Sequence, residues 1–233
     1  MIGGATRLVA LLGQPVAESL SPRMQNSAFA ARGLDWAYVA CEVAPERLTA
    51  AVRGLAALRF AGANVTIPHK QAAAELCDEA EATSVNTLVF EGQRVLGFNT
   101  DRAIVEGIDA ARVCLIGAGG AAEALKPGLR GEVRVFSRRG EWPPDASEAD
   151  LIVNTTPVRD ELLVAPRADQ NVVDLAYRGD GQPTALIEAA LAAGSPLVVD
   201  GLEALVRQGA ASFERWTGVP APVDVMRAAV RSA

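Results

Sequence analysis

The sequence predicts an α/β protein of two domains, in which the second domain carries a shortened parallel sheet. Apolar strand-like stretches alternate with helical ones along most of the 233 residues, a pattern typical of parallel or mixed sheets. A glycine-rich turn from Gly117 to Ala122 follows an apolar stretch and opens a helical one. Only ten residues separate Arg139 from Asp150, which is fewer than a parallel crossover needs.

Composition narrows the class of protein. Half of the residues are hydrophobic, so a sizeable core is available, and the net charge is −6. With no cluster of basic residues, we expect neither a nucleic-acid nor a membrane partner. The N-terminus lacks a signal-peptide pattern, and three scattered cysteines suit reduced thiols in a cytoplasm. His69 is the single histidine, and no spacing of ligands indicates a metal site.

The first domain is expected to alternate strands and helices and to end in a hairpin. Ser21 fits a helix N-cap before Pro22, and Ser19 places a second hydroxyl beside that helix start, where a small carboxylate can bind. The expected strands are 8–12, 36–43 and 61–66, the helices are 21–32, 45–58 and 70–80, and the hairpin pairs 84–90 with 94–98 across Glu91-Gly92.

The second domain is expected to lack one strand of the usual dinucleotide-binding order. The short segment after Arg139 contains two prolines, which leaves the second strand of this domain at the sheet edge. Lys126-Pro127-Gly128 should break the first helix early. The expected strands of this domain are 112–116, 132–136, 151–155, 171–175 and 197–199, with a helix at 183–193. Two more helices are expected after this domain, at 202–216 and 223–232.

One lysine stands out as a candidate for proton transfer. The chain has twenty arginines but only Lys70 and Lys126. A guanidinium keeps its proton at any working pH, whereas an ammonium can give one up. Lys70 closes the stretch Asn64-Val65-Thr66-Ile67-Pro68-His69-Lys70, which begins on an expected strand. We therefore expect Lys70 to take part in chemistry.

The glycine-rich turn predicts a nucleotide-binding, Rossmann-like domain. Backbone N–H groups of such a turn can approach a pyrophosphate. About twenty residues further on, an NAD site usually has an acid for the ribose. This sequence has Ser137-Arg138-Arg139 instead, and arginine pairs with a 2′-phosphate, so NADP is favoured; Glu141 nearby leaves NAD open.

In these blocks the chain resembles the shikimate dehydrogenase family. The resemblance is carried by Ser19-Leu20-Ser21-Pro22 with Asn26, by 64–70, by Val85-Asn86-Thr87 with Asn99-Thr100-Asp101, and by Gln208-Gly209-Ala210 before Phe213 and Trp216-Thr217-Gly218. It implies a cytoplasmic NADP-dependent oxidoreductase of aromatic amino acid biosynthesis, a monomer or homodimer that reversibly reduces 3-dehydroshikimate to shikimate. Residues 1–101 and 203–233 would form the substrate-binding and catalytic domain, and 102–202 the NADP-binding domain.

The resemblance also assigns roles residue by residue. Lys70 and Asp101 would be the catalytic pair. The substrate-binding residues would be Ser19, Ser21, Asn64, Thr66, Asn86, Tyr177 and Gln208. The cofactor-binding residues would be Gly117, Ala118, Gly119, Gly120, Ala121, Ser137, Arg138, Arg139, Thr155 and Gly201.

Some positions depart from the family pattern. Glu18 and Gln25 stand where histidines are usual, and Ala204 replaces a methionine expected near the nicotinamide. Thr83-Ser84 and Ile104 also differ from the usual residues. Two alternatives stay open at this point: a quinate or shikimate dehydrogenase that uses NAD, and a non-catalytic protein that kept the shikimate pocket.

Overall fold

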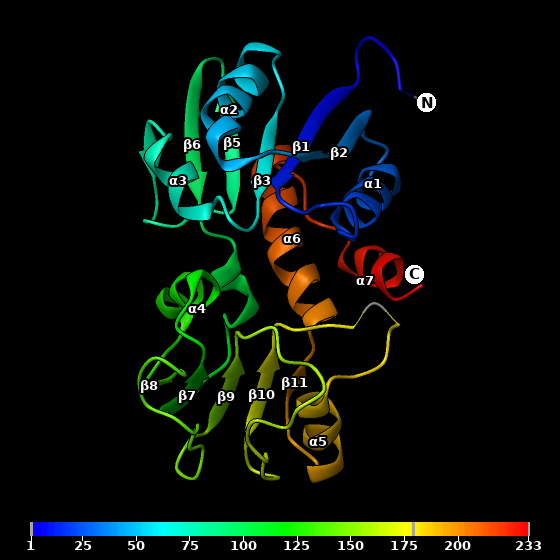
Figure 1. Ribbon diagram of the computed structural model, residues 1–233. Coiled ribbons are helices and arrows are strands. Elements are labelled where there is room, and N and C mark those ends of the chain that lie inside the picture. The colour runs from blue at the N-terminus through cyan, green and yellow to red at the C-terminus, as the bar shows by residue number, and fades with distance from the viewer. Residues whose placement is uncertain (1, 179, 233) are drawn as a thin grey trace. The chain divides into compact units, whose positions relative to one another are not determined.

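The computed structural model describes residues 2–178 and 180–232, and these form two compact units (Figure 1). The first unit is Met1–Asp101 with Val206–Ala233, and the second is Arg102–Leu205. The chain therefore leaves the first unit after Asp101 and returns to it within one long helix. The substrate-binding role expected for the first unit and the NADP-binding role expected for the second stay predictions. None of the described helices has the length and apolar character needed to cross a membrane.

The first unit is built on a six-stranded mixed sheet with the order β2-β1-β3-β5-β6-β4. The apolar run Leu8 to Leu12 lies in β1, which pairs in parallel with β2 and β3. β3, β5 and β6 then pair antiparallel. The strands are β1 (Arg7–Gly13), β2 (Trp36–Glu42), β3 (Gly62–Val65), β4 (Glu79–Ala80), β5 (Thr87–Glu91) and β6 (Arg94–Phe98).

Helices bury the two faces of this sheet. One core joins Leu12, Val65 and Leu88 of the sheet to Val52 of α2 and Ala73 of α3. Elsewhere Phe29 of α1 stacks on Phe213 of α6 with ring centroids 5.4 Å apart. The helices are α1 (Ser21–Ala31), α2 (Leu48–Ala57) after a 3-10 turn at Pro45–Arg47, α3 (Lys70–Glu75), α6 (Gly201–Thr217) and α7 (Val223–Arg231).

Three expectations for this unit were wrong in detail. Leu20, and not Ser21, is the N-cap of α1, whose first helical residue is Ser21. The helix from Lys70 ends at Glu75, because residues 79–80 form β4 beside β6. The hairpin closes between Glu91 and Arg94, which pair with each other, so Gly92 with its φ of 65° lies in the turn.

The second unit is a five-stranded, all-parallel sheet with the order β11-β10-β9-β7-β8. β8, the second strand along this part of the chain, is at the edge, so the expected loss of a third strand beyond it is confirmed. α4 is short and passes into a 3-10 turn at Lys126–Gly128, as the proline predicts. The elements are β7 (Arg112–Ile116), α4 (Gly120–Leu125), β8 (Glu132–Phe136), β9 (Leu151–Asn154), β10 (Asn171–Asp174), α5 (Ala185–Ala193) and β11 (Val198–Val199).

The parallel strands are covered on both faces, which explains their continuous apolar sequences. Alternate residues of β7 face different cores: Val113 and Leu115 pack with Leu125 of α4, while Cys114 and Ile116 pack with Leu186 of α5. Ala146 and Ala149, from the short segment after β8, pack into the second core. This segment covers part of the face that a full crossover would otherwise cover.

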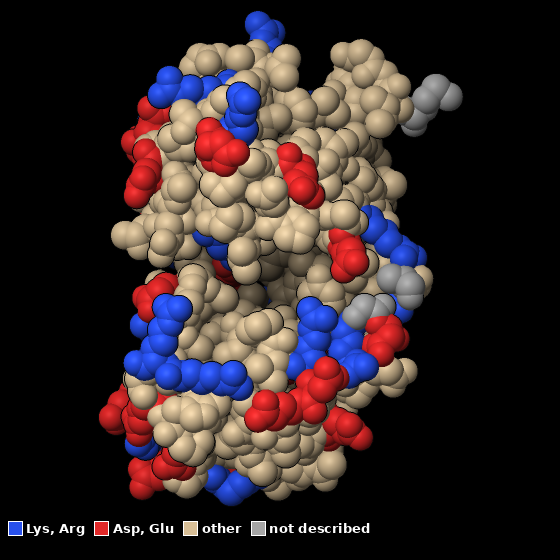
Figure 2. Space-filling model, in the orientation of Figure 1, with Lys and Arg blue, Asp and Glu red and all other residues tan. Residues whose placement is uncertain are grey.

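Charged side chains of both signs are interspersed on the surface in view (Figure 2). Many form exposed ion pairs, such as Arg112 with Glu148 at 3.5 Å and Arg130 with Asp109 at 3.3 Å. Exposed pairs of this kind contribute little to stability because water screens them.

Candidate active site

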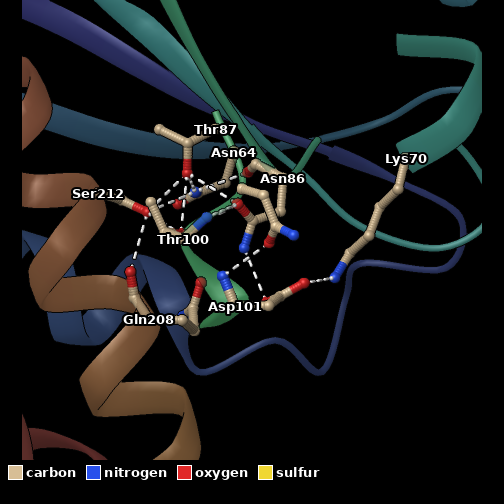
Figure 3. A network of polar contacts seen from close by, with 9 residues as sticks. Asn64, Lys70, Asn86, Thr87, Thr100, Asp101, Gln208 and Ser212 are labelled. Atoms are coloured by element: carbon tan, nitrogen blue, oxygen red, sulfur yellow. Dashed lines mark hydrogen bonds and ion pairs between the residues drawn. The ribbon is translucent and has the colours of Figure 1, made fainter. Parts of the chain in front are cut away.

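The first unit contains an ion pair between a lysine and an aspartate (Figure 3). Lys70 is the first residue of α3, directly after the loop that follows β3. Asp101 begins a short 3-10 helix, Asp101–Ile104, after β6. The Lys70 Nζ donates to Asp101 Oδ2 at 2.5 Å, with side-chain exposures of 20% and 11%. An ammonium held this way is fixed in place yet still reached by solvent.

Asn86 fixes the second oxygen of the same carboxylate. Its Nδ2 donates to Asp101 Oδ1 at 2.7 Å. Its Oδ1 accepts from the Thr100 N–H at 2.8 Å and from the Thr100 hydroxyl at 3.0 Å. The two ends of the amide are therefore distinguished by their partners. Because Asp101 N–H also donates to Asn99 Oδ1 at 3.1 Å, the aspartate is held on three sides.

Three hydroxyls form a buried cluster behind Asn86. The Thr87 Oγ1 lies 3.1 Å from Thr100 Oγ1 and 2.8 Å from Ser212 Oγ, and the last two are 3.0 Å apart. Ser212 also donates to the Gln208 carbonyl at 3.0 Å (Figure 3). Sequence reasoning gave these hydroxyls no role. Thr87 and Thr100 do stand beside expected site residues, and Ser212 lies one turn after Gln208 on α6.

Asn64 joins this cluster from the end of β3. Its Nδ2 lies 2.9 Å from the Asn86 carbonyl, 3.1 Å from Thr87 Oγ1 and 3.0 Å from Ser212 Oγ. Its Oδ1 accepts from the Tyr38 hydroxyl at 2.8 Å. Asn64 is only 6% exposed. The structure thus brings Asn64, Asn86, Lys70 and Asp101 into one connected network, with Gln208 attached through its backbone.

Ser19 and Ser21 lie at the start of α1. The Ser21 N–H donates to Ser19 Oγ at 3.3 Å, and the Ser21 side chain lies near the Tyr38 phenol. Burial raises the pKa of Tyr38 far above its usual range, and the nearby Ser21 hydroxyl opposes that shift only in part. Tyr38 therefore stays a neutral phenol. Sequence reasoning missed it, because an aromatic residue within a strand reads as ordinary core.

Thr66 follows β3 directly. Its N–H donates to the Leu12 carbonyl at 2.8 Å, and its carbonyl accepts from the His69 N–H at 2.9 Å. Gly13 lies against the Thr66 methyl group, which a Cβ on Gly13 would approach to 2.3 Å. His69 is buried and bonds the Val43 carbonyl through Nε2 at 2.7 Å, which is a structural role.

In the glycine-rich turn of the second unit, Gly117 is closely packed, whereas Gly119 and Gly120 have open space beside them. Gly117 has a φ of 113°, and a Cβ there would lie 2.2 Å from Thr155 Oγ1. That hydroxyl is already used, since it donates to the Ile116 carbonyl at 2.9 Å. Beyond it, a Cβ on Gly119 or Gly120 would meet no atom within 4 Å. The exposed backbone from Ala118 to Gly120 thus leaves room for a pyrophosphate, with Ala121 following in α4.

The expected phosphate-binding arginines lie in a tight loop after β8. Ser137 N–H donates to the Glu141 carbonyl and Gly140 N–H to the Ser137 carbonyl, both at 2.9 Å. Arg138 and Arg139 are exposed in this loop. Glu141, the acid that kept an NAD site open as an alternative, pairs through its carboxylate with Arg134.

A buried carboxylate organises the loops that follow β9 and β10. Asp174 accepts from Asn154 Nδ2 at 2.9 Å, the Ala176 N–H at 3.0 Å and the Thr184 hydroxyl at 2.5 Å. Burial raises its pKa, and these hydrogen bonds oppose that shift. Tyr177 follows this point in the chain. Gly201 is pressed against the same loop, since a Cβ there would lie 2.5 Å from the Ala176 carbonyl oxygen.

Within the described part of the chain, no group of three His, Cys, Asp or Glu side chains is placed to hold a metal ion. The expected catalytic pair and the residues expected to touch the substrate, Tyr177 apart, lie in the first unit, and the residues expected to touch the cofactor lie in the second. The structure brings together Lys70, Asp101, Asn64 and Asn86 directly.

Comparison with known proteins shows the family to which the chain is similar. The profile of the shikimate dehydrogenase substrate binding domain matches residues 11–88, and that of the shikimate 5′-dehydrogenase C-terminal domain matches residues 201–231. The NADP(+) shikimate dehydrogenase of Anaeromyxobacter dehalogenans is 44% identical over 275 positions, covering 98% of this chain and 97% of that protein. Since this chain has 233 residues, that relative carries segments which this chain lacks.

Solved structures share this fold. A shikimate dehydrogenase in complex with NADP+ is 31% identical with a TM-score of 0.89, covering 100% of this chain and 97% of that one. The enzyme of Thermus thermophilus, in complex with NADP(H) and shikimate, is 31% identical with a TM-score of 0.86, covering 97% and 99%. Fold, lysine–aspartate pair and glycine-rich turn define an α/β oxidoreductase with a Rossmann-like unit. The relatives place it more narrowly: the chain belongs to the shikimate dehydrogenase family.

Proposed function

We propose that this chain is an NADP-dependent shikimate dehydrogenase, which reversibly reduces 3-dehydroshikimate to shikimate. The observation that carries the proposal is the Lys70–Asp101 contact of 2.5 Å, held from behind by Asn86. Relatives with this activity in their names match nearly the whole chain. The hydrogen-bond network holds Lys70 in place, so its position favours a catalytic role for this lysine over a role in packing.

Reduction of a ketone requires a hydride at carbon and a proton at oxygen. NADPH supplies the hydride when it is bound. Lys70 Nζ donates the proton and hydrogen-bonds the oxygen on which negative charge develops. Asp101 keeps the ammonium in position and accepts from a substrate hydroxyl, and Asn86 keeps the carboxylate from rotating. In the reverse direction Lys70 takes the proton back.

We assign the remaining substrate contacts to the residues that surround this pair in sequence and fold. Ser19 and Ser21 bind the substrate carboxylate with hydroxyls at the start of α1. Asn64, Thr66, Asn86, Gln208 and Tyr177 bind the ring hydroxyls. The side chains of Asn64 and Asn86 already have protein partners, so they hold fixed orientations before the substrate arrives.

The second unit holds NADP at its carboxyl edge. The residues at 117–121 leave space for the pyrophosphate, with Thr155 supporting the turn and Gly201 beside the loop of Ala176. Arg138, Arg139 and Ser137 receive the 2′-phosphate. Because Glu141 pairs with Arg134, its carboxylate competes less for these arginines, and NADP is favoured over NAD.

The proposal is tested by NADPH oxidation with 3-dehydroshikimate, comparing wild type with Lys70→Ala. Lys126→Ala is the matched control, because Lys126 is the other lysine and forms an exposed pair with Glu123. We expect Lys70→Ala to lower kcat by about 100-fold or more, the size of general acid catalysis, and Lys126→Ala to leave it unchanged. Wild type that binds shikimate without turnover would show the non-catalytic alternative instead.

Cytoplasmic location and a monomeric or homodimeric state stay predictions. Light scattering of the purified chain during gel filtration checks the second of these.

A further inference from the structure

We propose that Tyr38 is a positioning residue whose buried hydroxyl orients the Asn64 amide, at the ring-hydroxyl end of the substrate site. The inference rests on the proposed function and adds a residue to it. Tyr38 is 2% exposed and lies in β2, one strand away from β1 and two from β3. It acts through its neighbours and is not itself assigned a contact with the substrate.

The hydroxyl of Tyr38 is bonded to Asn64. It donates to Asn64 Oδ1 at 2.8 Å, and the Ser21 side chain lies near it. A phenol has one proton to donate, so this bond uses its whole donor capacity. Because burial keeps the phenol protonated, the donation to Asn64 persists across the working pH range.

This donation decides which way the Asn64 amide faces. With Oδ1 bound to Tyr38, Nδ2 is turned toward the Asn86 carbonyl and the hydroxyls of Thr87 and Ser212. A flip of the amide would bring its NH2 against the phenol and its oxygen against the Asn86 carbonyl, where two acceptors would meet. Tyr38 thus sets the orientation of Asn64, which donates directly to the Asn86 carbonyl.

The backbone around Tyr38 ties the helix of Ser21 to the same strand. Asn26, also on α1, donates through Nδ2 to the Tyr38 carbonyl at 2.9 Å and accepts from the Tyr38 N–H at 2.8 Å. This two-point contact fixes the register between α1 and β2 at Tyr38. The Trp216 ring, 6.1 Å from that of Tyr38, packs beside it.

Tyr38→Phe removes the hydroxyl while keeping the ring. We expect the dissociation constant for shikimate, and its KM, to rise about tenfold, because Asn64 Oδ1 loses its buried partner. We expect kcat to change less than KM, and the KM for NADP to stay as in wild type. A purely structural role would lower thermal stability without this split between the two substrates.

A double-mutant cycle with Asn64→Ala tests this bond itself. If Tyr38 acts through Asn64, Tyr38→Phe raises the dissociation constant for shikimate by a smaller factor in the Asn64→Ala background than in wild type. Factors that simply multiply would overturn the proposed role of Tyr38. Thr217→Val is the matched control for loss of a bonded hydroxyl in the same unit, since the Thr217 hydroxyl donates to the Phe213 carbonyl at 2.8 Å; it should leave shikimate binding unchanged.

Calorimetry with shikimate separates this inference from the proposed function. If wild type binds shikimate but does not turn over, the proposed function fails, and the dissociation constants still decide the role of Tyr38. If wild type turns over and Tyr38→Phe binds shikimate as wild type does, the inference about Tyr38 is wrong and the proposed function stands. If wild type does not bind shikimate, both are wrong.

Discussion

Single residues of this chain show how strongly chemistry depends on the partners of a side chain. Lys70 was a candidate for proton transfer because lysine is so rare in this chain. The structure places its Nζ 2.5 Å from Asp101 Oδ2. Asp101 and Asn86 were expected from their motifs, and both are in the network. The hydroxyl cluster could not be assigned from sequence, since its contacts join distant positions such as Thr87 and Ser212, 125 residues apart.

The change Asp101→Asn tests the charge of this carboxylate. The new amide would keep the shape and one acceptor oxygen but would lose the ion pair with Lys70 and place an NH2 against another donor. We expect kcat to fall by about 10- to 100-fold with little change in melting temperature. Asp109→Asn, which alters an exposed pair with Arg130, is the control. Unchanged kcat in the Asp101 variant would remove Asp101 from the mechanism.

The three thiols predict how stability depends on alkaline pH. Burial raises the pKa of Cys77 to about 11 and that of Cys114 to about 12, with Asp78 and Asp145 adding to the respective shifts, and burial also raises the pKa of Cys41. The folded state therefore keeps thiol protons that the unfolded chain releases near the ordinary value of 9.0. Stability is unaffected below that pH and falls as pH rises above it.

Urea unfolding on either side of pH 9 measures this effect, and Cys114→Ala should make the decline less steep. A free energy of unfolding that rises with pH in this range would contradict the assigned burial of the thiols.

At the scale of elements, close backbone approaches fix the sheet of the first unit. Gly62 of β3 lies where a Cβ would come within 2.2 Å of the Leu88 carbonyl oxygen and 2.4 Å of Trp216 Nε1. That indole donates to the same carbonyl at 2.9 Å and so anchors α6, which carries Gln208 and Ser212, to β5. The position of the hydroxyl cluster therefore depends on a glycine with no site role of its own.

Gly62→Ala should lower the free energy of unfolding by about 1–3 kcal/mol, as overpacking does. Gly54→Ala is its counterpart, because Gly54 lies within α2 and a Cβ there meets nothing within 4 Å. That change should raise stability by about 0.5–1 kcal/mol through helix propensity and a less flexible unfolded chain. Equal effects of the two changes, measured by denaturant unfolding, would contradict the close packing at β3.

Element types were predictable from sequence more often than element ends. The buried strands and the short α4 followed from apolar runs and from Pro127. The helix at Lys70 was predicted too long, because the pairing of residues 79–80 with β6 is a long-range contact that local pattern does not show. Ser21 looked like a cap, yet Leu20 is the N-cap of α1 and the Ser21 side chain lies near Tyr38 on another element.

At the scale of the whole molecule, the main difference from a full dinucleotide-binding fold is the loss of a crossover from the second unit. The segment after β8 covers part of the sheet with Ala146 and Ala149 and leaves β8 at the edge. The sequence predicted this from a shortage of residues, since length limits topology whatever the side chains are. The glycine-rich turn and the arginine loop both remain, so the parts that would hold the phosphates of the cofactor are retained.

The most direct test of this account is the rate of shikimate oxidation by the purified wild-type chain with NADP and, in parallel, with NAD. We predict turnover with NADP and a kcat/KM for NADP at least about tenfold above that for NAD, because Arg138 and Arg139 are expected to meet the 2′-phosphate through charge-assisted hydrogen bonds. Equal or better turnover with NAD would contradict the assignment of the arginine loop. No turnover with either cofactor would contradict the proposal that the shortened unit still serves catalysis.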